Sequence, residues 1–355
     1  EYVQEVNESL DELFFKLSEN NETKLANYYD KLIEKYSNEI GQKALLEKAK
    51  LLLKQQRFEE VLVLQKELEK VPDRFEIKPE ELIYEAAKSL ALQNLQKDEC
   101  QAVVTMIETY KLQIGEKEYE EKLFQCFMRT SRFERAREIS SSHLKDSALQ
   151  SRYKWAQKEV QALFMMGKYQ EVIGFKEDLK TLSFSLREKI GLETIRDLFF
   201  SLVKLKNLEG ATSLAESIKI LYPDESTNLD IYYEIVKMAA DAKNDLLLVT
   251  YAQAIIEMQK KFKSTTLTPT VEFSYIDALK RLGRDDEALN IAESLLPLSL
   301  NNKDKIRLFY QAGELSLKRQ ENAKAKEYFT KCIAINENST WKGICQQNLD
   351  LLIAQ

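Results

Sequence analysis

Helix-breaking residues are scarce in this 355-residue chain, which has only 9 glycines and 5 prolines. An average globular composition would give roughly 25 glycines and 18 prolines at this length. Because both residues interrupt helices, their shortage predicts long helices joined by short turns. Charged residues make up 31% of the chain, so each helix is expected to keep one solvated face.

Other absences argue against several classes of function. The formal net charge is −6, which does not support a nucleic-acid footprint. No apolar run reaches the length of a membrane span of about 18 residues. The chain also has no Gly-rich phosphate loop, no H-E-x-x-H metal motif and no G-x-S-x-G nucleophile motif. We therefore expect a protein that is not an enzyme, binds no cofactor or metal, and does not insert into a membrane.

A short pattern recurs along the chain: a turn, an acidic residue or two, and a small or apolar residue that opens an apolar stripe. It is clearest in LGRDDEALNIAESLL from Leu282 and in MGKYQEVIGFKEDL from Met166. We call the small or apolar residue the anchor of its repeat. Anchors recur on average about every 37.5 residues. They are Leu25, Val61, Ala102, Ala136, Val172, Ala211, Leu248, Ala288 and Ala325.

The residues around most anchors have the spacing of two amphipathic helices. Apolar residues follow at anchor +4, +7 and +8, which is one side of a helix. A second stripe precedes the anchor, as in Tyr232, Ile235, Val236 and Ala239 before Leu248. Gly283 and Gly167 are suited to end the first helix, because glycine adopts positive φ easily. Two repeats fit less well, since Gln65 and Lys176 occupy the +4 position.

This pattern resembles the tetratricopeptide repeat, whose period is near 34 residues. The residues that carry the resemblance are Gly283 with Ala288, Gly313 with Ala325, and the aromatic Phe329. The resemblance covers nearly the whole chain and implies an all-α fold, a right-handed superhelical α-solenoid. It implies about nine helical hairpins and a capping helix, or about nineteen helices. Spacings of up to 41 residues depart from the pattern and leave Sel1-like or HEAT-like hairpins as alternatives.

The two ends of the predicted solenoid differ. We expect one continuous solenoid over residues 1–339 and a capping helix over 340–355, with Trp341 and Cys345 on its apolar side. At the other end, an apolar stripe from Val3 to Leu17 opens the chain where a first repeat normally has a polar outer face. The chain also starts at Glu1 rather than Met. A processed or truncated piece of a longer protein is therefore expected.

A partner-binding surface is expected on the first helices. The tetratricopeptide resemblance implies that the first helix of each pair lines a concave wall. Tyr233, Phe273 and Tyr310 each lie fifteen residues before an anchor, so they are predicted to form an aromatic stripe that binds a partner segment. The alternative is that these rings fill the seams between helices. No convincing set of Lys, Asn and Arg forms a carboxylate clamp for chaperone tails.

The single histidine and the four cysteines are expected to be structural. His143 lies seven residues after Ala136, an offset that faces the core in other repeats, so we expect a packing imidazole rather than a base. The cysteines are too few for a disulfide scaffold and fit no zinc pattern. We expect small buried hydrophobes, with a bridge between Cys332 and Cys345 as the alternative in an oxidising compartment.

Two short stretches bear on location. Asn7 and Asn21 lie in EVNES and ENNET, which match the bacterial N-glycosylation sequon with an acid two residues before the asparagine. With the ending STWKGICQQNLDLL, the chain resembles the C-terminal repeat region of PflA-type paralysed-flagellum proteins. That resemblance implies a periplasmic scaffold that places stator units in a flagellar motor and contacts disc or spoke components. The alternatives are a cytoplasmic adaptor or co-chaperone that binds peptides, and an accessory segment of an enzyme.

Overall fold

The computed structural model describes residues 22–223, 228–261, 269–297 and 300–354. All regular structure in these ranges is helical, from α2 to α21, and no strand occurs in them. The predicted all-α class is therefore confirmed. The chain divides into two compact units, Glu1–Asp146 and Ser147–Gln355. Continuity of one solenoid over residues 1–339 stays a prediction, and the apolar stripe from Val3 to Leu17 lies outside the described residues.

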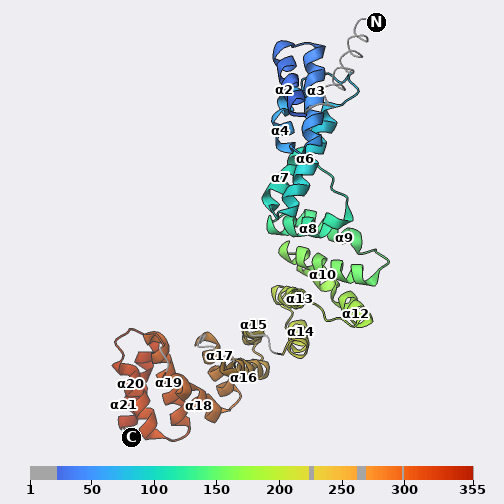
Figure 1. The fold of residues 1–355 in the computed structure, drawn as a ribbon. Coiled ribbons are helices and arrows are strands. Elements are labelled where there is room, and N and C mark those ends of the chain that lie inside the picture. Colours follow the sequence, from blue (N-terminus) through green and yellow to red (C-terminus); the bar gives the residue numbers. More distant parts are fainter. Residues whose placement is uncertain (1–21, 224–227, 262–268, 298–299, 355) are drawn as a thin grey trace. The chain divides into compact units, whose positions relative to one another are not determined.

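The first unit is a stack of helical hairpins (Figure 1). Its hairpins are α3 with α4 and α5, α6 with α7, and α8 with α9, and α2 packs against α3. The helices are α2 (Glu22–Lys35), α3 (Glu39–Lys54), α4 (Phe58–Val63), α5 (Gln65–Leu68), α6 (Pro79–Gln96), α7 (Cys100–Tyr110), α8 (Lys117–Arg129) and α9 (Phe133–His143).

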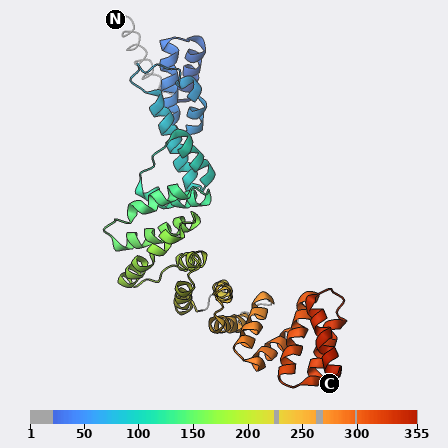
Figure 2. The ribbon, with the colours of Figure 1, turned by 180° about the vertical axis from the view of Figure 1, so that it is seen from behind.

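The second unit continues the same alternation and ends in the predicted cap. Its hairpins are α10 with α11 and α12, α13 with α14, α15 with α16, α17 with α18, and α19 with α20. The last helix, α21, packs against both α19 and α20 (Figures 1 and 2). The helices are α10 (Leu149–Met165), α11 (Tyr169–Gly174), α12 (Lys176–Leu186), α13 (Leu192–Lys204), α14 (Leu208–Leu221), α15 (Asn228–Asp241), α16 (Asp245–Lys261), α17 (Pro269–Arg281), α18 (Asp285–Leu295), α19 (Asn302–Lys318), α20 (Asn322–Ala334) and α21 (Thr340–Ala354).

One turn geometry joins the two helices of every described hairpin. In the turn at Gly283, its N–H donates to Lys280 O at 3.1 Å, and the next N–H, of Arg284, donates to Leu279 O at 2.9 Å. This pair of bonds is the Schellman motif, which requires a left-handed residue just past the helix. That left-handed residue is always found, and is glycine in only two turns: Gln56, Asp98, Ser131, Gly167, Lys206, Lys243, Gly283 and Gln320.

The anchors lie five residues after these left-handed positions and are completely buried. Seven predicted anchors have no exposed surface: Val61, Ala136, Val172, Ala211, Leu248, Ala288 and Ala325. The prediction is wrong by one residue in the third repeat, where Val103 is the buried anchor and Ala102 is half-buried. The turn explains the shift, because its left-handed residue is Asp98, five residues before Val103.

The two repeats with a long polar side chain at anchor +4, Gln65 and Lys176, have broken second helices. α4 gives way to α5 at Leu64, and α11 gives way to α12 at Phe175, so both breaks fall at anchor +3. A lysine or glutamine at +4 of an unbroken helix would point into the core, where burial of its polar group is unfavourable. After the break, Leu68 and Leu179 at +7 are fully buried instead.

The last hairpin shows how closely the helices approach. A Cβ placed on Gly313 of α19 would lie 2.5 Å from Cε1 of Phe329 on α20. Phe329 is fully buried, and so is the anchor Ala325 one turn before it. Glycine is therefore needed at position 313 for α19 and α20 to pack at this distance, as the repeat resemblance implies.

The turn geometry makes a prediction at Gly283. Replacing it with alanine should lower the free energy of unfolding by about 1–2 kcal/mol, because φ is +72° and a side chain is strained in that conformation. A Cβ there would meet no other atom within 4 Å, so the backbone strain is the only cost. Urea unfolding measures this. The control is Gly343→Ala inside α21, where nothing lies within 4 Å either and alanine should stabilise by about 0.5–1 kcal/mol. Equal midpoints for the two variants would contradict the assigned turn.

Candidate functional site

Four successive first helices of the second unit, α13, α15, α17 and α19, form a continuous surface that we call the first-helix wall. Arg196 of α13 donates to Asp230 of α15 at 3.1 Å. α15 packs against α17. Lys280 of α17 then pairs with Glu314 of α19. Contacts between neighbouring first helices thus link every member of the wall to the next.

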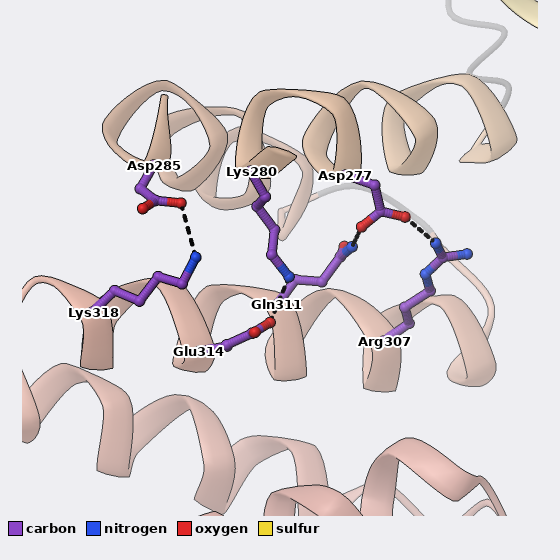
Figure 3. Close-up of polar contacts among 7 residues, drawn as sticks. All are labelled: Asp277, Lys280, Asp285, Arg307, Gln311, Glu314 and Lys318. Carbon is purple, nitrogen blue, oxygen red and sulfur yellow. Dashed lines mark hydrogen bonds and ion pairs between the residues drawn. The ribbon is translucent and has the colours of Figure 1, made fainter. Parts of the chain in front are cut away.

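The contact between α17, the start of α18 and α19 is a ladder of polar side chains (Figure 3). Asp277 accepts from Arg307 at 2.9 Å and from Gln311 at 2.7 Å. The ladder continues at Lys280 with Glu314 and ends where Lys318 approaches Asp285 at 3.3 Å. These side chains are partly buried but still reach solvent, and ion pairs open to solvent contribute only about 0–1 kcal/mol each. The order of these ion pairs along the helices therefore matters more for fixing the register between hairpins than for overall stability.

The three aromatic residues of the predicted stripe all lie on the wall, but in different environments. Phe273 is only 4% exposed, and the guanidinium carbon of Arg307 lies 4.3 Å from the centre of its ring. Tyr310 is half-buried and stacks on Trp341 of α21, with ring centres 4.8 Å apart. Tyr233 is half-buried too, and its hydroxyl accepts from Gln259 at 2.7 Å. Phe273 thus fills a seam, and partner binding by the stripe stays a prediction.

A groove of about 650 Å³ lies on the wall between α13 and α15. Its apolar lining comes mainly from Phe200, Val203 and Met238. Charged side chains also line it: Lys204, Lys206, Glu234, Lys237 and Asp241. This volume falls in the range of about 300–1,000 Å³ that is typical of binding sites. The groove was not predicted from the sequence, because its apolar residues lie at other offsets from the anchors than the aromatic stripe.

An acidic side chain of the wall has a strongly altered pKa. Burial raises the pKa of Asp197 on α13 to about 7, and the nearby Glu193 carboxylate adds to this rise. The Arg196 guanidinium opposes it only in part. Loss of hydration disfavours the charged form of a carboxyl group, and a like charge has the same effect. Asp197 is therefore protonated over a pH range in which ordinary aspartates are ionised.

His143 connects two helices of the first unit through polar contacts. Its Nε2 lies 2.8 Å from Oε2 of Glu120 on α8, and its Nδ1 lies 2.9 Å from Oδ2 of Asp146. The ring is 8% exposed, as expected for a packing residue, but its neighbours are carboxylates rather than apolar side chains. In the described parts of the chain, no group of three or more His, Cys, Asp or Glu side chains is placed to hold a metal ion.

All four cysteines are paired in disulfides, so the expectation of small buried thiols is wrong. Cys332–Cys345 joins α20 to α21, so the bridge kept as an alternative is present. Cys100–Cys126 joins α7 to α8 and was missed. The sequence carries no signal for it, because nothing within α7 or α8 marks the partner. The candidate glycosylation sites Asn7 and Asn21 lie outside the described residues.

Alanine substitutions at Phe273 and Tyr233 should differ in how much stability they remove. Phe273→Ala should lower the free energy of unfolding by about 3–5 kcal/mol, because it leaves a cavity in a buried seam. Tyr233→Ala should cost less, near the roughly 0.5–1.5 kcal/mol of its hydrogen bond plus a partly buried ring. Chemical denaturation of both variants measures the difference. A larger loss for Tyr233→Ala would contradict the burial described here.

Asp197 gives a pH-dependent prediction. Between about pH 4 and 7 the folded state binds a proton at Asp197 that the unfolded state releases, so the stability contributed by this group falls as pH rises. Asp197→Asn cannot ionise and should lose less stability over this range. The variant should therefore melt higher relative to the wild type at pH 8 than at pH 4. Parallel melting curves for the two proteins across this range would refute the raised pKa.

No protein-family model matches the chain, and no curated protein sequence matches it. Among solved structures it is similar to a tetratricopeptide repeat protein from Parabacteroides merdae, with 13% identity and a TM-score of 0.37 over 76% of this chain and 98% of that one. It is also similar to the pentatricopeptide repeat protein PPR10 from maize, with 13% identity and a TM-score of 0.36 over 98% of this chain and 53% of that one. The helical-hairpin fold class is shown by the packing of this chain's own helices.

Proposed function

We propose that this chain is a non-enzymatic scaffold that binds partner proteins on its first-helix wall. The observation that carries the proposal is the groove of about 650 Å³ between α13 and α15, in which an apolar floor lies beside lysines and carboxylates. Protein interfaces commonly combine an apolar centre with a polar rim. Tyr233 on α15 adds a half-buried aromatic side chain to the same wall, and tyrosine is enriched among residues that dominate binding energy.

We further propose that the protein works in an oxidising compartment, the bacterial periplasm. The support is that both disulfides together use every cysteine of the chain, with no free thiol left. Disulfides persist outside the cytosol and are rare within it, where thiols are kept reduced. No helix in the described ranges is long and apolar enough to cross a membrane.

The specific role that we propose is a structural component of the flagellar motor, needed for stator placement and motility. The support is the sequence resemblance to the repeat region of PflA-type proteins, together with the disulfides. The alternative is a cytoplasmic adaptor that binds peptides on the same wall. The two proposals share the binding surface and differ in compartment and in the effect of removing the protein.

The compartment can be tested on the cysteines. Cells of the source organism are quenched in acid, and the protein is treated with a maleimide that adds a large mass to each free thiol. A periplasmic protein should gain no mass without reduction and a mass for each of its four cysteines after reduction. Labelling of all four without reduction would support the cytoplasmic alternative.

The scaffold role can be tested on the groove. Deletion of the gene should stop swimming while leaving flagellar filaments in place, and the wild-type gene should restore swimming. Met238→Arg places a bulky cation in the groove and should fail to restore swimming. The melting temperature should change little, because Met238 lines the groove rather than the core. The matched control is Leu246→Arg on α16, where the leucine is 68% exposed. Normal swimming of the deletion strain would refute the motor role.

A further inference from the structure

The second helices of the second unit carry a groove of their own. It measures about 370 Å³ and lies between α12 and α14, with residues of α13 also in its lining. Ile195, Leu198 and Leu214 are buried residues in that lining, and the half-buried Ile190 closes one end. The end is held in place because Tyr222 donates to Ile190 O at 2.5 Å and Lys189 donates to Leu221 O at 3.2 Å.

The groove has a structural origin in the broken helix of this repeat. α11 packs against α13, but after the break at Phe175 α12 packs against α10 instead. The side of the groove that α14 contributes carries the small side chains of Ser213 and Ser217. Ser217 donates its hydroxyl to Ser213 O within the helix, so the Ser217 hydroxyl needs no outside partner.

Large apolar side chains lie exposed beside this groove. Ile220 lines it and is 78% exposed. Phe184 is 86% exposed and lies one helical turn after Lys180, which lines the groove, so it belongs to the same side of α12. Apolar side chains this exposed around a concave surface are typical of interaction sites.

The charges in the groove are one-sided. Lys176 and Lys180 line it from α12, one turn apart, and no ion pair joins either of them to a carboxylate among the described residues. Glu177 is the one acidic residue in the lining, and the side contributed by α14 carries no charge. An occupant that fits must therefore be apolar toward α14 and negative toward α12.

We propose that the groove between α12 and α14 binds an acidic amphipathic helix of a partner protein. Lys176 to Ser183 spans about two helical turns, which matches the apolar face of a short helix. The apolar residues of the partner would lie against Ile220 and Leu214, beside Phe184. Its carboxylates would lie against Lys176 and Lys180. A flat lipid surface fits less well, because the apolar lining is concave. Its lining shares no residue with the groove between α13 and α15, and the proposal does not depend on the compartment.

The test uses two synthetic peptides of about four helical turns, both with leucines at i, i+3, i+4 and i+7. One carries glutamates beside the leucine stripe, and the other carries lysines at the same positions. Fluorescence anisotropy of the labelled peptides with the full chain should show binding of the acidic peptide only. Binding should weaken as salt is added, since lysine and carboxylate charges are screened.

Charge reversal makes the test specific. Lys176→Glu with Lys180→Glu should weaken binding of the acidic peptide by roughly tenfold and create binding of the basic one. Phe184→Ala should weaken binding of the acidic peptide without changing the melting temperature, because the ring is exposed. The matched control is Lys66→Glu with Lys70→Glu beside α5, the other broken second helix, where both lysines are exposed.

Several outcomes would overturn the proposal. One is equal binding of the two peptides by the wild type, and another is unchanged binding by the charge-reversed variant. A third is binding to anionic phosphatidylglycerol vesicles through Lys176 and Lys180 without peptide binding, which would make the groove a lipid contact. Failure of the motor tests would leave these measurements unaffected, because they use the purified chain.

Discussion

The structure depends on one close contact that recurs in every described hairpin, the burial of the anchor between the two helices. A residue with no exposed surface in that place requires the second helix to begin at a fixed distance from the end of the first. The Schellman turn provides that distance, with a left-handed residue five positions before the anchor. Six of these eight positions are not glycine. Packing of the anchor therefore outweighs the local cost of a left-handed side chain at those turns.

The fold could be predicted from the sequence because this contact requires a small or apolar residue at regular intervals along the chain. Small residues mark the tightest approach, and Gly313 under the ring of Phe329 shows why a methyl group there is excluded. Apolar stripes on both sides of each anchor gave the two helices. Among the described turns, the anchor is displaced by one residue in the third repeat alone, where the prediction was Ala102 and the buried residue is Val103. The capping helix was predicted for the same reason, since its apolar side has a counterpart in α19 and α20.

The candidate sites were harder to predict than the fold, because they depend on which side chains stay exposed once neighbouring repeats have packed. An offset of fifteen residues placed Tyr233, Phe273 and Tyr310 on the same wall. It could not reveal that Arg307 would cover Phe273 or that Tyr310 would stack on Trp341. These contacts join neighbouring repeats, and their partners are about one repeat apart in sequence. The Cys100–Cys126 bridge was missed for the same reason, since nothing within either helix marks its partner.

The polar residue at anchor +4 links the packing rule to both proposed surfaces. Where the rule holds, as in α16 and α18, the second helix stays continuous, and the first helices are left to form the wall. Where Lys176 violates it, the second helix breaks, and the half that follows moves against α10 rather than α13. The same lysine that cannot enter the core then lines the groove that the break leaves open. A local departure from the repeat pattern thus has a physical consequence elsewhere on the surface, and departures of this kind are where function is best sought in a repeat protein.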